Sequence, residues 1–240
     1  MWKGFYRSFA LWYSLEMHEY PVFLNLSGKK CLVLGAGGVG LRKIRTLLSS
    51  NVGMMDVIEL YASDDLRKEL LSDKRVTLLE RNFSEDDLDN VFLVVAATND
   101  HELNARVAEL CIQRNILCNI ADLPEKSSFI VPASVCRGPL TVCVSTDGKS
   151  PAMAKRVRRE LEEHFGNEYE ELLAIMGRIR PRLIAMNMET TEHTRIFRAL
   201  VYSNLIEALE AKDVASIENI LSENLPAELQ GMIPELVNGL

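Results

Sequence analysis

The hydrophobic positions between residues 20 and 122 fall into short, nearly unbroken runs separated by amphipathic stretches. Unbroken apolar runs are typical of strands that are buried on both faces of a parallel sheet. The predicted strands are KKCLVLG, DVIELYA, RVTLLE, VFLVVAAT and ILCNIAD. Helical spacing between these runs predicts helices over 38–49, 64–72, 85–89 and 100–113. The alternation predicts an α/β fold with a doubly wound parallel sheet, in which ligands bind at the C-terminal ends of the strands.

The pattern changes after residue 122. Two β-rich segments, SFIVPASV and PLTVCVST, are joined by Cys136-Arg137-Gly138 and predict an antiparallel pair outside the parallel sheet. The spacing is then helical over 150–165, 167–187 with a kink at Pro181, 191–211 and 213–222. We therefore divide the chain into a leader (1–19), a parallel-sheet domain (20–122), a β region (123–150), a helical domain (151–225) and a tail (226–240) that we expect to be poorly ordered.

Composition narrows the class of protein. The chain has 240 residues, of which 48% are hydrophobic and 25% charged, as in ordinary globular proteins. Its net charge of -7 argues against general binding to nucleic acid or to a membrane surface. Charged residues such as Arg7 and Glu16 interrupt the leader, which predicts neither a signal peptide nor a membrane span. No C-x-x-C pair or metal-site spacing occurs, so we expect no bound metal, and reduced, mostly buried cysteines in a cytoplasmic protein.

The run CLVLGAGGVGL places three glycines between a predicted strand and a predicted helix. In such a turn Gly35 permits the backbone reversal, Gly37 lets a pyrophosphate approach the main chain, and Gly40 lets the helix pack against the strand. The free amides and the dipole at the helix N-terminus favour phosphate charge. An ordinary strand-to-helix turn is the alternative. We predict a Rossmann-type dinucleotide site with Gly35, Gly37, Gly38 and Val39 as cofactor contacts.

Acidic residues near the end of the strand DVIELYA bear on the choice of cofactor. An acid there favours the ribose diol of NAD over the phosphate of NADP. Asp64 and Asp65 follow the strand, further from the glycine turn than the usual spacing of about 20 residues, and Glu59 lies inside it. We predict NAD, with Asp64 at the ribose, or Ser63 there and Asp64 only as a helix cap. Thr98, at the end of VFLVVAAT, is a further predicted contact.

Residues 20 to 200 contain, in this order, YPVFLNLSGKKCLVLGAGGVGLRKIRTLL, ATND followed by LNARVAELC, NIADLPEKSSFIVPASVCRGPLTVCVSTDGKSPAMAKRVRREL, and RIFRAL. These motifs resemble the precorrin-2 dehydrogenase family, which includes the N-terminal module of siroheme synthase and bifunctional dehydrogenase-ferrochelatases. The resemblance implies an NAD-binding Rossmann domain, a dimerisation region over 123–150 and a helical C-terminal part. It also implies a homodimer that oxidises precorrin-2 to sirohydrochlorin with NAD, followed in some members by iron insertion.

One stretch departs from the family pattern. Fused siroheme synthases read Ser-Ser-Gly-Gly before the Ser-Pro pair, whereas this chain has Ser145-Thr146-Asp147-Gly148-Lys149. Thr146 keeps the hydroxyl at the second position, but two charged residues are added. The phosphate-modified serine described for some relatives is therefore not carried over to this chain.

The resemblance implies a substrate with eight carboxylates, which requires cationic side chains. Residues 131–160 contain six basic and two acidic residues, a local charge of 6 minus 2, or +4. Arginine suits carboxylates best, through bidentate contacts. The alternative is an ordinary solvated helix face. The predicted substrate contacts are Arg137, Thr146, Lys149, Ser150, Lys155 and Arg156.

Asp122 ends the fifth predicted strand, where the sheet meets its ligand crevice. A carboxylate there can accept the proton released as hydride leaves the substrate, or pyrrole N–H protons during metal entry. The family's key aspartate falls at this NIAD position, and the alternative is an aspartate that only forms the turn before Pro124. His101 is a weaker candidate, because a histidine there more often caps the following helix.

Two other functions remain open at this point. One is a nucleotide-sensing regulatory protein, which would bind NAD but needs no polyanion pocket. The other is a chelatase that lacks dehydrogenase activity, because an aspartate at a strand end serves either step.

Overall fold

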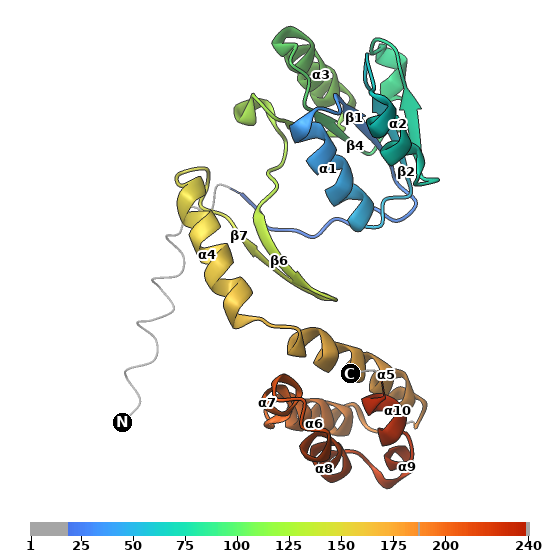
Figure 1. Ribbon diagram of the computed structural model, residues 1–240, viewed down its shortest axis with the longest axis vertical. Coiled ribbons are helices and arrows are strands. Elements are labelled where there is room, and N and C mark those ends of the chain that lie inside the picture. The colour runs from blue at the N-terminus through green and yellow to red at the C-terminus, as the bar shows by residue number, and fades with distance from the viewer. Residues whose placement is uncertain (1–18, 187, 239–240) are drawn as a thin grey trace. The chain divides into compact units, whose positions relative to one another are not determined.

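The computed structural model describes residues 19–186 and 188–238. The chain divides into two compact units, one ending at Val131 and the other beginning at Pro132 (Figure 1). Residues 1–18 of the predicted leader lie outside the described residues. Each unit is described by itself below.

The first unit is built on a five-stranded parallel sheet. Its strands are β1 (Lys30–Leu34), β2 (Met54–Ile58), β3 (Val76–Leu79), β4 (Leu93–Ala96) and β5 (Leu117–Ile120). They lie in the order β3-β2-β1-β4-β5, and every neighbouring pair is parallel. The predicted Rossmann-type α/β fold is confirmed, with each strand slightly shorter than its apolar run.

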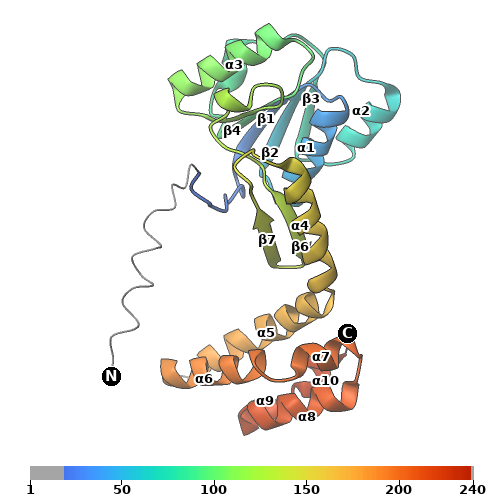
Figure 2. The ribbon, with the colours of Figure 1, turned by 90° about the vertical axis from the view of Figure 1, so that its left-hand side faces the viewer.

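Helices cover both faces of this sheet, as Figure 2 shows. The elements between the strands are α1 (Gly38–Ser49), α2 (Asp64–Leu71), the 3-10 turn η2 (Glu85–Leu88), α3 (His101–Arg114) and the 3-10 turn η3 (Pro124–Lys126). Cys31 and Val33 of β1 share a core with Ile44 of α1. The alternate residues Leu32 and Leu34 share the opposite core with α3. Both faces of β1 are buried, which explains its unbroken apolar sequence.

Side-chain caps set where the helices begin. The Ser63 hydroxyl accepts a hydrogen bond from the Leu66 amide at 3.2 Å and starts α2. Asp100 accepts from the Leu103 amide at 3.0 Å and starts α3. The predicted helix over 85–89 is instead the 3-10 turn η2, which Ser84 begins with a capping box. Each such cap contributes about 1 kcal/mol.

The second unit opens with an antiparallel pair, β6 (Ala133–Arg137) and β7 (Leu140–Val144), as predicted. The helix α4 (Pro151–His164) packs against both strands, and Val135 is buried beneath it. Residues 128–132, which the sequence places in the first strand, are not part of β6. The Ser128 hydroxyl instead binds the Cys118 amide of β5 at 2.7 Å, because the free edge of the parallel sheet offers unpaired backbone groups.

The remainder of the second unit is helical. Its helices are α5 (Glu168–Ala185), α6 (Thr190–Val201), α7 (Leu205–Glu210), α8 (Val214–Asn224), α9 (Ala227–Gln230) and α10 (Ile233–Val237). Helix α5 continues through Pro181. The predicted helix over 191–211 is broken after Val201, so that Leu205 and Leu209 turn into the core that they share with α5 and α8.

The expectation of a poorly ordered tail is corrected by α9 and α10. Leu229, Ile233 and Leu236 are buried in the same core as α5. Pro226 and Pro234 stand at the starts of these two short helices, where a missing N–H costs nothing. Apolar burial therefore holds residues 227–237 in place.

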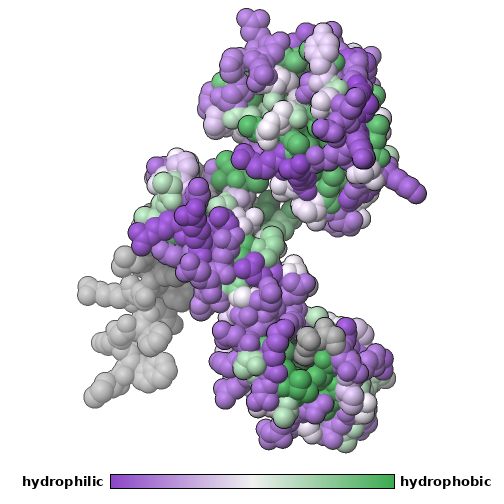
Figure 3. Space-filling model, viewed as in Figure 1, coloured by the Kyte–Doolittle hydropathy of each residue, from purple (hydrophilic) through white to green (hydrophobic). Residues whose placement is uncertain are grey.

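The visible surface is mostly hydrophilic, with smaller hydrophobic patches on each unit (Figure 3). None of the described helices combines the length and the hydrophobicity needed to cross a bilayer.

Candidate active site

A cleft of about 540 Å³ lies at the carboxyl edge of the parallel sheet. It is lined mainly by residues at and after the ends of β1, β2 and β4, together with residues 81–83 after β3 and one residue each from α2 and α3. The strand order reverses between β1 and β4, which is where ligands bind in doubly wound sheets. Four of the predicted cofactor contacts line the cleft, namely Gly35, Gly37, Ser63 and Thr98. Three other predicted contacts do not line the cleft: Asp64, and Gly38 and Val39, which lie in the first turn of α1.

The three glycines of the turn have different surroundings. Gly35 has a φ of +83°, and a Cβ there would lie 2.7 Å from the carbonyl oxygen of Ala97. A Cβ on Gly40 would lie 1.9 Å from the Gly35 oxygen. These two positions require glycine for backbone packing. Gly37 has no neighbouring atom within 4 Å of an added Cβ, and it precedes α1 without a side-chain cap. The main chain at Gly37 is therefore open to a phosphate group.

Glu59 is the carboxylate that the cleft presents at the end of β2. Its side chain accepts hydrogen bonds from the Ala36 amide at 2.6 Å and from the Tyr61 amide at 3.4 Å. Sequence reasoning missed this role because it placed Glu59 inside the strand. The available signal was spacing, since Glu59 follows Gly40 by 59 minus 40, or 19, residues, close to the usual spacing of about 20.

Asp64 and Ser63 are placed differently from Glu59. The Asp64 side chain is fully exposed and pairs with Arg67 at 2.7 Å. Ser63 lines the cleft, although its hydroxyl already caps α2. The charge nearest the glycine turn therefore comes from Glu59.

Asp122 lies at the end of β5 in a hydrogen-bond network. Its Oδ1 accepts from the Asn104 amide group at 2.9 Å, and its Oδ2 pairs with Nδ1 of His101. Asn104 is fully buried, donates to the Thr98 carbonyl at 3.1 Å, and accepts from the Thr98 hydroxyl at 2.7 Å. Because Thr98 lines the cleft, this network connects Asp122 to the cleft. A fully hydrogen-bonded buried amide holds its partners rigidly.

The network keeps Asp122 ionised. Partial burial alone raises the pKa of the Asp122 carboxyl, but hydrogen bonds from His101, from its own backbone amide and from Asn104 outweigh this effect. The pKa of Asp122 is therefore below its usual range. At neutral pH the group is a carboxylate that can accept a proton.

His101 does not cap α3, contrary to the sequence interpretation. Asp100 is the cap, and the His101 imidazole turns toward Asp122 while remaining 78% exposed. The pairing depends on β4 and β5 being neighbours, because the two residues are 21 positions apart. Within residues 19–186 and 188–238, no three His, Cys, Asp or Glu side chains are placed to hold a metal ion.

The predicted substrate contacts lie in the second unit and are largely engaged within it. Arg137 donates to the carbonyl oxygens of Cys136 and Glu162, both at 3.0 Å, and thereby fastens α4 to β6. Lys149 pairs with Asp147 at 2.8 Å.

Most of the other predicted substrate contacts are also engaged within the second unit. The Thr146 hydroxyl donates to the Ser150 carbonyl at 3.1 Å, and Ser150 caps α4. Arg156 pairs with Glu160 at 2.8 Å. Lys155 is exposed and has no ion-pair partner among the described residues. The local charge of +4 therefore overstates the cationic surface that this region offers.

Two protein-family models match the chain. One, described as "Putative NAD(P)-binding", matches residues 22–133. The other, described as "Sirohaem biosynthesis protein central", matches residues 137–164. The first match contains the glycine turn, Glu59 and Asp122, and the second contains most of α4.

This chain is similar to known proteins along most of its length. It is 33% identical over 190 residues to the siroheme synthase of Vesicomyosocius okutanii subsp. Calyptogena okutanii (strain HA), covering 79% of this chain and 40% of that protein. It is 35% identical over 191 residues to the siroheme synthase of Thioalkalivibrio sulfidiphilus (strain HL-EbGR7), covering 80% of this chain and 39% of that protein. The chain thus spans less than half the length of these relatives.

The solved structure of SirC, precorrin-2 dehydrogenase, has the same fold, with a TM-score of 0.72 and 24% sequence identity. The match covers 85% of this chain and 98% of that chain. The two family models match the chain in the order in which the sequence motifs occur, and the similarity to known proteins extends over both matched regions. This chain is therefore similar to siroheme synthases, and the two models that match it are those of an NAD(P)-binding region and of a sirohaem biosynthesis central region.

Proposed function

We propose that this protein oxidises precorrin-2 to sirohydrochlorin with NAD, as a step of siroheme biosynthesis. The observation that carries the proposal is the cleft in which an open glycine turn and Glu59 adjoin the network of an ionised aspartate, Asp122. A protein of the same fold is named a precorrin-2 dehydrogenase, and the longer proteins that are similar in sequence are named siroheme synthases.

The residues of the cleft fit NAD. The main chain at Gly37 and the start of α1 would hold the pyrophosphate, and Glu59 would hold the ribose diol. The Glu59 carboxylate would repel the extra phosphate of NADP, which favours NAD. Bound NAD supplies the acceptor for a hydride. Gly38, Val39, Ser63 and Thr98 stay predicted contacts.

Asp122 would act as the base. Oxidation of precorrin-2 removes a hydride and a proton, and the Asp122 carboxylate takes the proton. Asn104 holds one carboxylate oxygen, while the exposed His101 imidazole at the other can pass the proton to solvent. Thr146, Lys149, Ser150, Lys155, Arg137 and Arg156 stay predicted substrate contacts.

One assay tests the function. Purified protein is incubated anaerobically with precorrin-2 and NAD, and the absorbance of sirohydrochlorin and NADH is followed. We expect both to appear in equal amounts. NAD binding without turnover would point to a nucleotide sensor. Addition of Fe(II) or Co(II) to the same sample then tests the chelatase step, and insertion into supplied sirohydrochlorin without prior oxidation would identify a chelatase alone.

Glu59→Gln is expected to weaken NAD binding about tenfold and to narrow the preference for NAD over NADP. The charge-assisted hydrogen bonds to the ribose diol contribute about 1.5 kcal/mol or more, and a tenfold change in affinity corresponds to about 1.4 kcal/mol. Calorimetric titration with both nucleotides measures this. The matched control is Asp64→Asn, which should leave both affinities unchanged. The reverse pattern would assign the ribose to Asp64.

We propose a homodimer that forms through β6 and β7. A two-stranded sheet is marginal alone, and each of these strands has an edge without a partner strand among the described residues. Helix α4 covers the apolar face of the pair, so the proposal rests on the open edges and the exposed Ile130 and Val131. Light scattering should return about twice 27.0 kDa. A mass near 27.0 kDa at working concentration would contradict the dimer.

We propose a cytoplasmic location on the basis of the cysteines. All five are free thiols, of which Cys31, Cys111 and Cys118 are buried and Cys136 and Cys143 are exposed. Burial raises the pKa of Cys31 to about 11 and that of Cys111 to about 12, which makes these thiols unreactive. Exposed free thiols are typical of a reducing compartment.

A further inference from the structure

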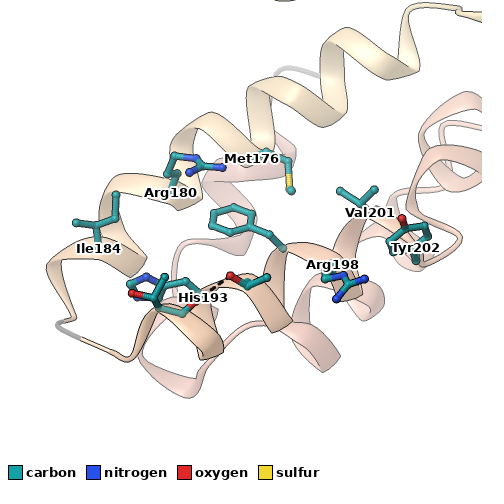
Figure 4. Close-up of a pocket in the computed structure, with 10 residues that line it drawn as sticks. Met176, Arg180, Ile184, His193, Arg198, Val201 and Tyr202 are labelled. Carbon is teal, nitrogen blue, oxygen red and sulfur yellow. Dashed lines mark hydrogen bonds between the residues drawn. The ribbon is translucent and has the colours of Figure 1, made fainter. Parts of the chain in front are cut away.

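A groove of about 570 Å³ lies between α5 and α6 in the second unit. Met176, Arg180 and Ile184 project into it from α5 (Figure 4). The helix α6 and its C-cap supply the opposite wall, which includes the residues His193, Phe197 and Arg198. Phe197 and Arg198 belong to the RIFRAL motif, for which the proposed dehydrogenase chemistry assigns no role.

The groove is cationic. Arg180 and Arg198 both line it, and none of its lining residues is acidic. Neither guanidinium has an ion-pair partner among the described residues, in contrast to Arg195 on the same helix, which pairs with Glu192 at 3.3 Å. An unpaired guanidinium presents its donors in a planar fork that matches a carboxylate.

Contacts with neighbouring side chains hold part of the polar lining of the groove in place. The Arg180 guanidinium lies over the Phe197 ring, 4.7 Å from its centroid, and this cation–π contact holds the guanidinium beside the wall of the groove. The Nε2 atom of His193 is buried and has no hydrogen-bond partner among the described residues. Because this atom has almost no accessible surface, the donors that a ligand in the groove would meet are those of Arg180 and Arg198. The groove therefore favours a ligand with several acceptor oxygens.

The rest of the lining is apolar and exposed. The exposed fractions are 58% for Ile184, 43% for Val201 and 81% for Tyr202. A flat apolar ring laid on these side chains and on the Arg180–Phe197 pair would remove them from water. A compact inorganic anion would leave this surface uncovered, so the lining selects an apolar body that carries carboxylates.

We propose that the groove between α5 and α6 binds a carboxylate-bearing tetrapyrrole. This inference rests on the proposed function for the identity of the ring, because precorrin-2 and its product combine a large ring system with acidic side chains. The charge and the apolar lining of the groove are independent of Asp122. Arg180 and Arg198 bind carboxylates of the ligand, and Phe197 and Tyr202 contact its ring.

The test is a binding titration with uroporphyrin III, a stable tetrapyrrole with eight carboxylates, on the full chain without NAD. The variant Arg180→Ala/Arg198→Ala removes both unpaired guanidiniums. We expect its Kd to be about tenfold higher, because each partly exposed charge contact contributes a few-fold. Binding to the unchanged protein should weaken as salt is raised, since exposed charges are screened.

The matched control is Arg182→Ala/Arg195→Ala, which removes the same charge from the same two helices outside the groove. Its Kd should stay within twofold of the unchanged protein. Equal affinities of both double variants, or no binding of uroporphyrin to the unchanged protein, would overturn the proposal. Circular dichroism checks that each variant is folded, which the exposure of all four arginines favours.

The two proposals fail separately. Loss of porphyrin affinity only in the groove variant, together with no oxidation of precorrin-2 by the unchanged protein, would retain the groove and reject the dehydrogenase. Oxidation with unchanged porphyrin affinity in the groove variant would retain the dehydrogenase and reject the groove. A groove variant that changes the mass measured by light scattering, but not the porphyrin affinity, would show that the groove is instead a contact between copies of the chain.

Discussion

Asp122→Asn is expected to lower the turnover number for precorrin-2 oxidation about 10²- to 10⁴-fold, the usual contribution of a general base. Asparagine keeps the size of the side chain and can still form hydrogen bonds with Asn104 and His101, but it cannot accept a proton. The affinity for NAD and the thermal stability should change little. Steady-state rates, calorimetry and thermal unfolding measure the three quantities.

The control for this substitution is Asp89→Asn, which changes an exposed aspartate paired with Arg114 at 2.9 Å. It should leave the rate unchanged. If Asp122 only forms the turn before Pro124, the opposite pattern follows: stability falls and the rate per folded molecule is preserved. If oxidation survives and metal insertion fails, Asp122 serves the chelatase step alone.

The same carboxyl affects stability as the pH falls. Its pKa is lower in the folded protein than in the unfolded chain, so the ionised group stabilises the fold above about pH 4. This contribution is lost as the pH falls through the lowered pKa. Asp122→Asn should therefore reduce the slope of stability against pH below about pH 4, which acid titration of the unfolding transition measures.

Gly37→Val is expected to weaken NAD binding at least 100-fold while the protein stays folded. A Cβ at Gly37 meets no atom within 4 Å, and the backbone there has a φ of -64°, which any residue adopts. The added methyl groups would occupy the space through which a pyrophosphate approaches the main chain. Calorimetry measures the affinity, and unchanged NAD binding in the folded variant would refute the assignment of the turn.

Gly40→Ala is the informative contrast within the same turn. Its Cβ would lie 1.9 Å from the backbone oxygen of Gly35, so α1 and β1 would have to move apart. We expect the free energy of unfolding to fall by about 3 kcal/mol, the upper part of the usual range for overpacking. Chemical denaturation measures this loss. The two variants therefore distinguish a glycine that contacts the cofactor from a glycine that the packing of α1 on β1 requires.

The helical part of the chain shows where sequence patterns are insufficient. Apolar residues from Ile196 to Leu209 repeat at helical spacing across the break between α6 and α7, where no glycine or proline stands. The break exists because Leu205 and Leu209 reach the common core only if the chain turns back. Helical periodicity reports which residues are apolar, but not where a helix must stop to bury them.

The cofactor cleft shows the same limit more sharply. The sequence placed acidic residues near the end of β2, but it could not tell which carboxylate faces the glycine turn. Glu59 does so because the turn after β1 brings the Ala36 amide to the end of the neighbouring strand β2. Asp64 lies at the start of α2, beyond the loop that follows β2, and faces solvent.

The sequence by itself determined the parallel sheet, the glycine turn and the position of Asp122 at a strand end. Each of these depends on local periodicity or on residues adjacent in the chain. Only the tertiary structure decided that His101 and Asn104 meet Asp122, that Arg137 is bonded to the Glu162 carbonyl, and that Arg180 and Arg198 line one groove. In each case the residues are 18 or more positions apart in the chain. Their proximity follows from strand order and helix packing, which spacing along the chain does not specify.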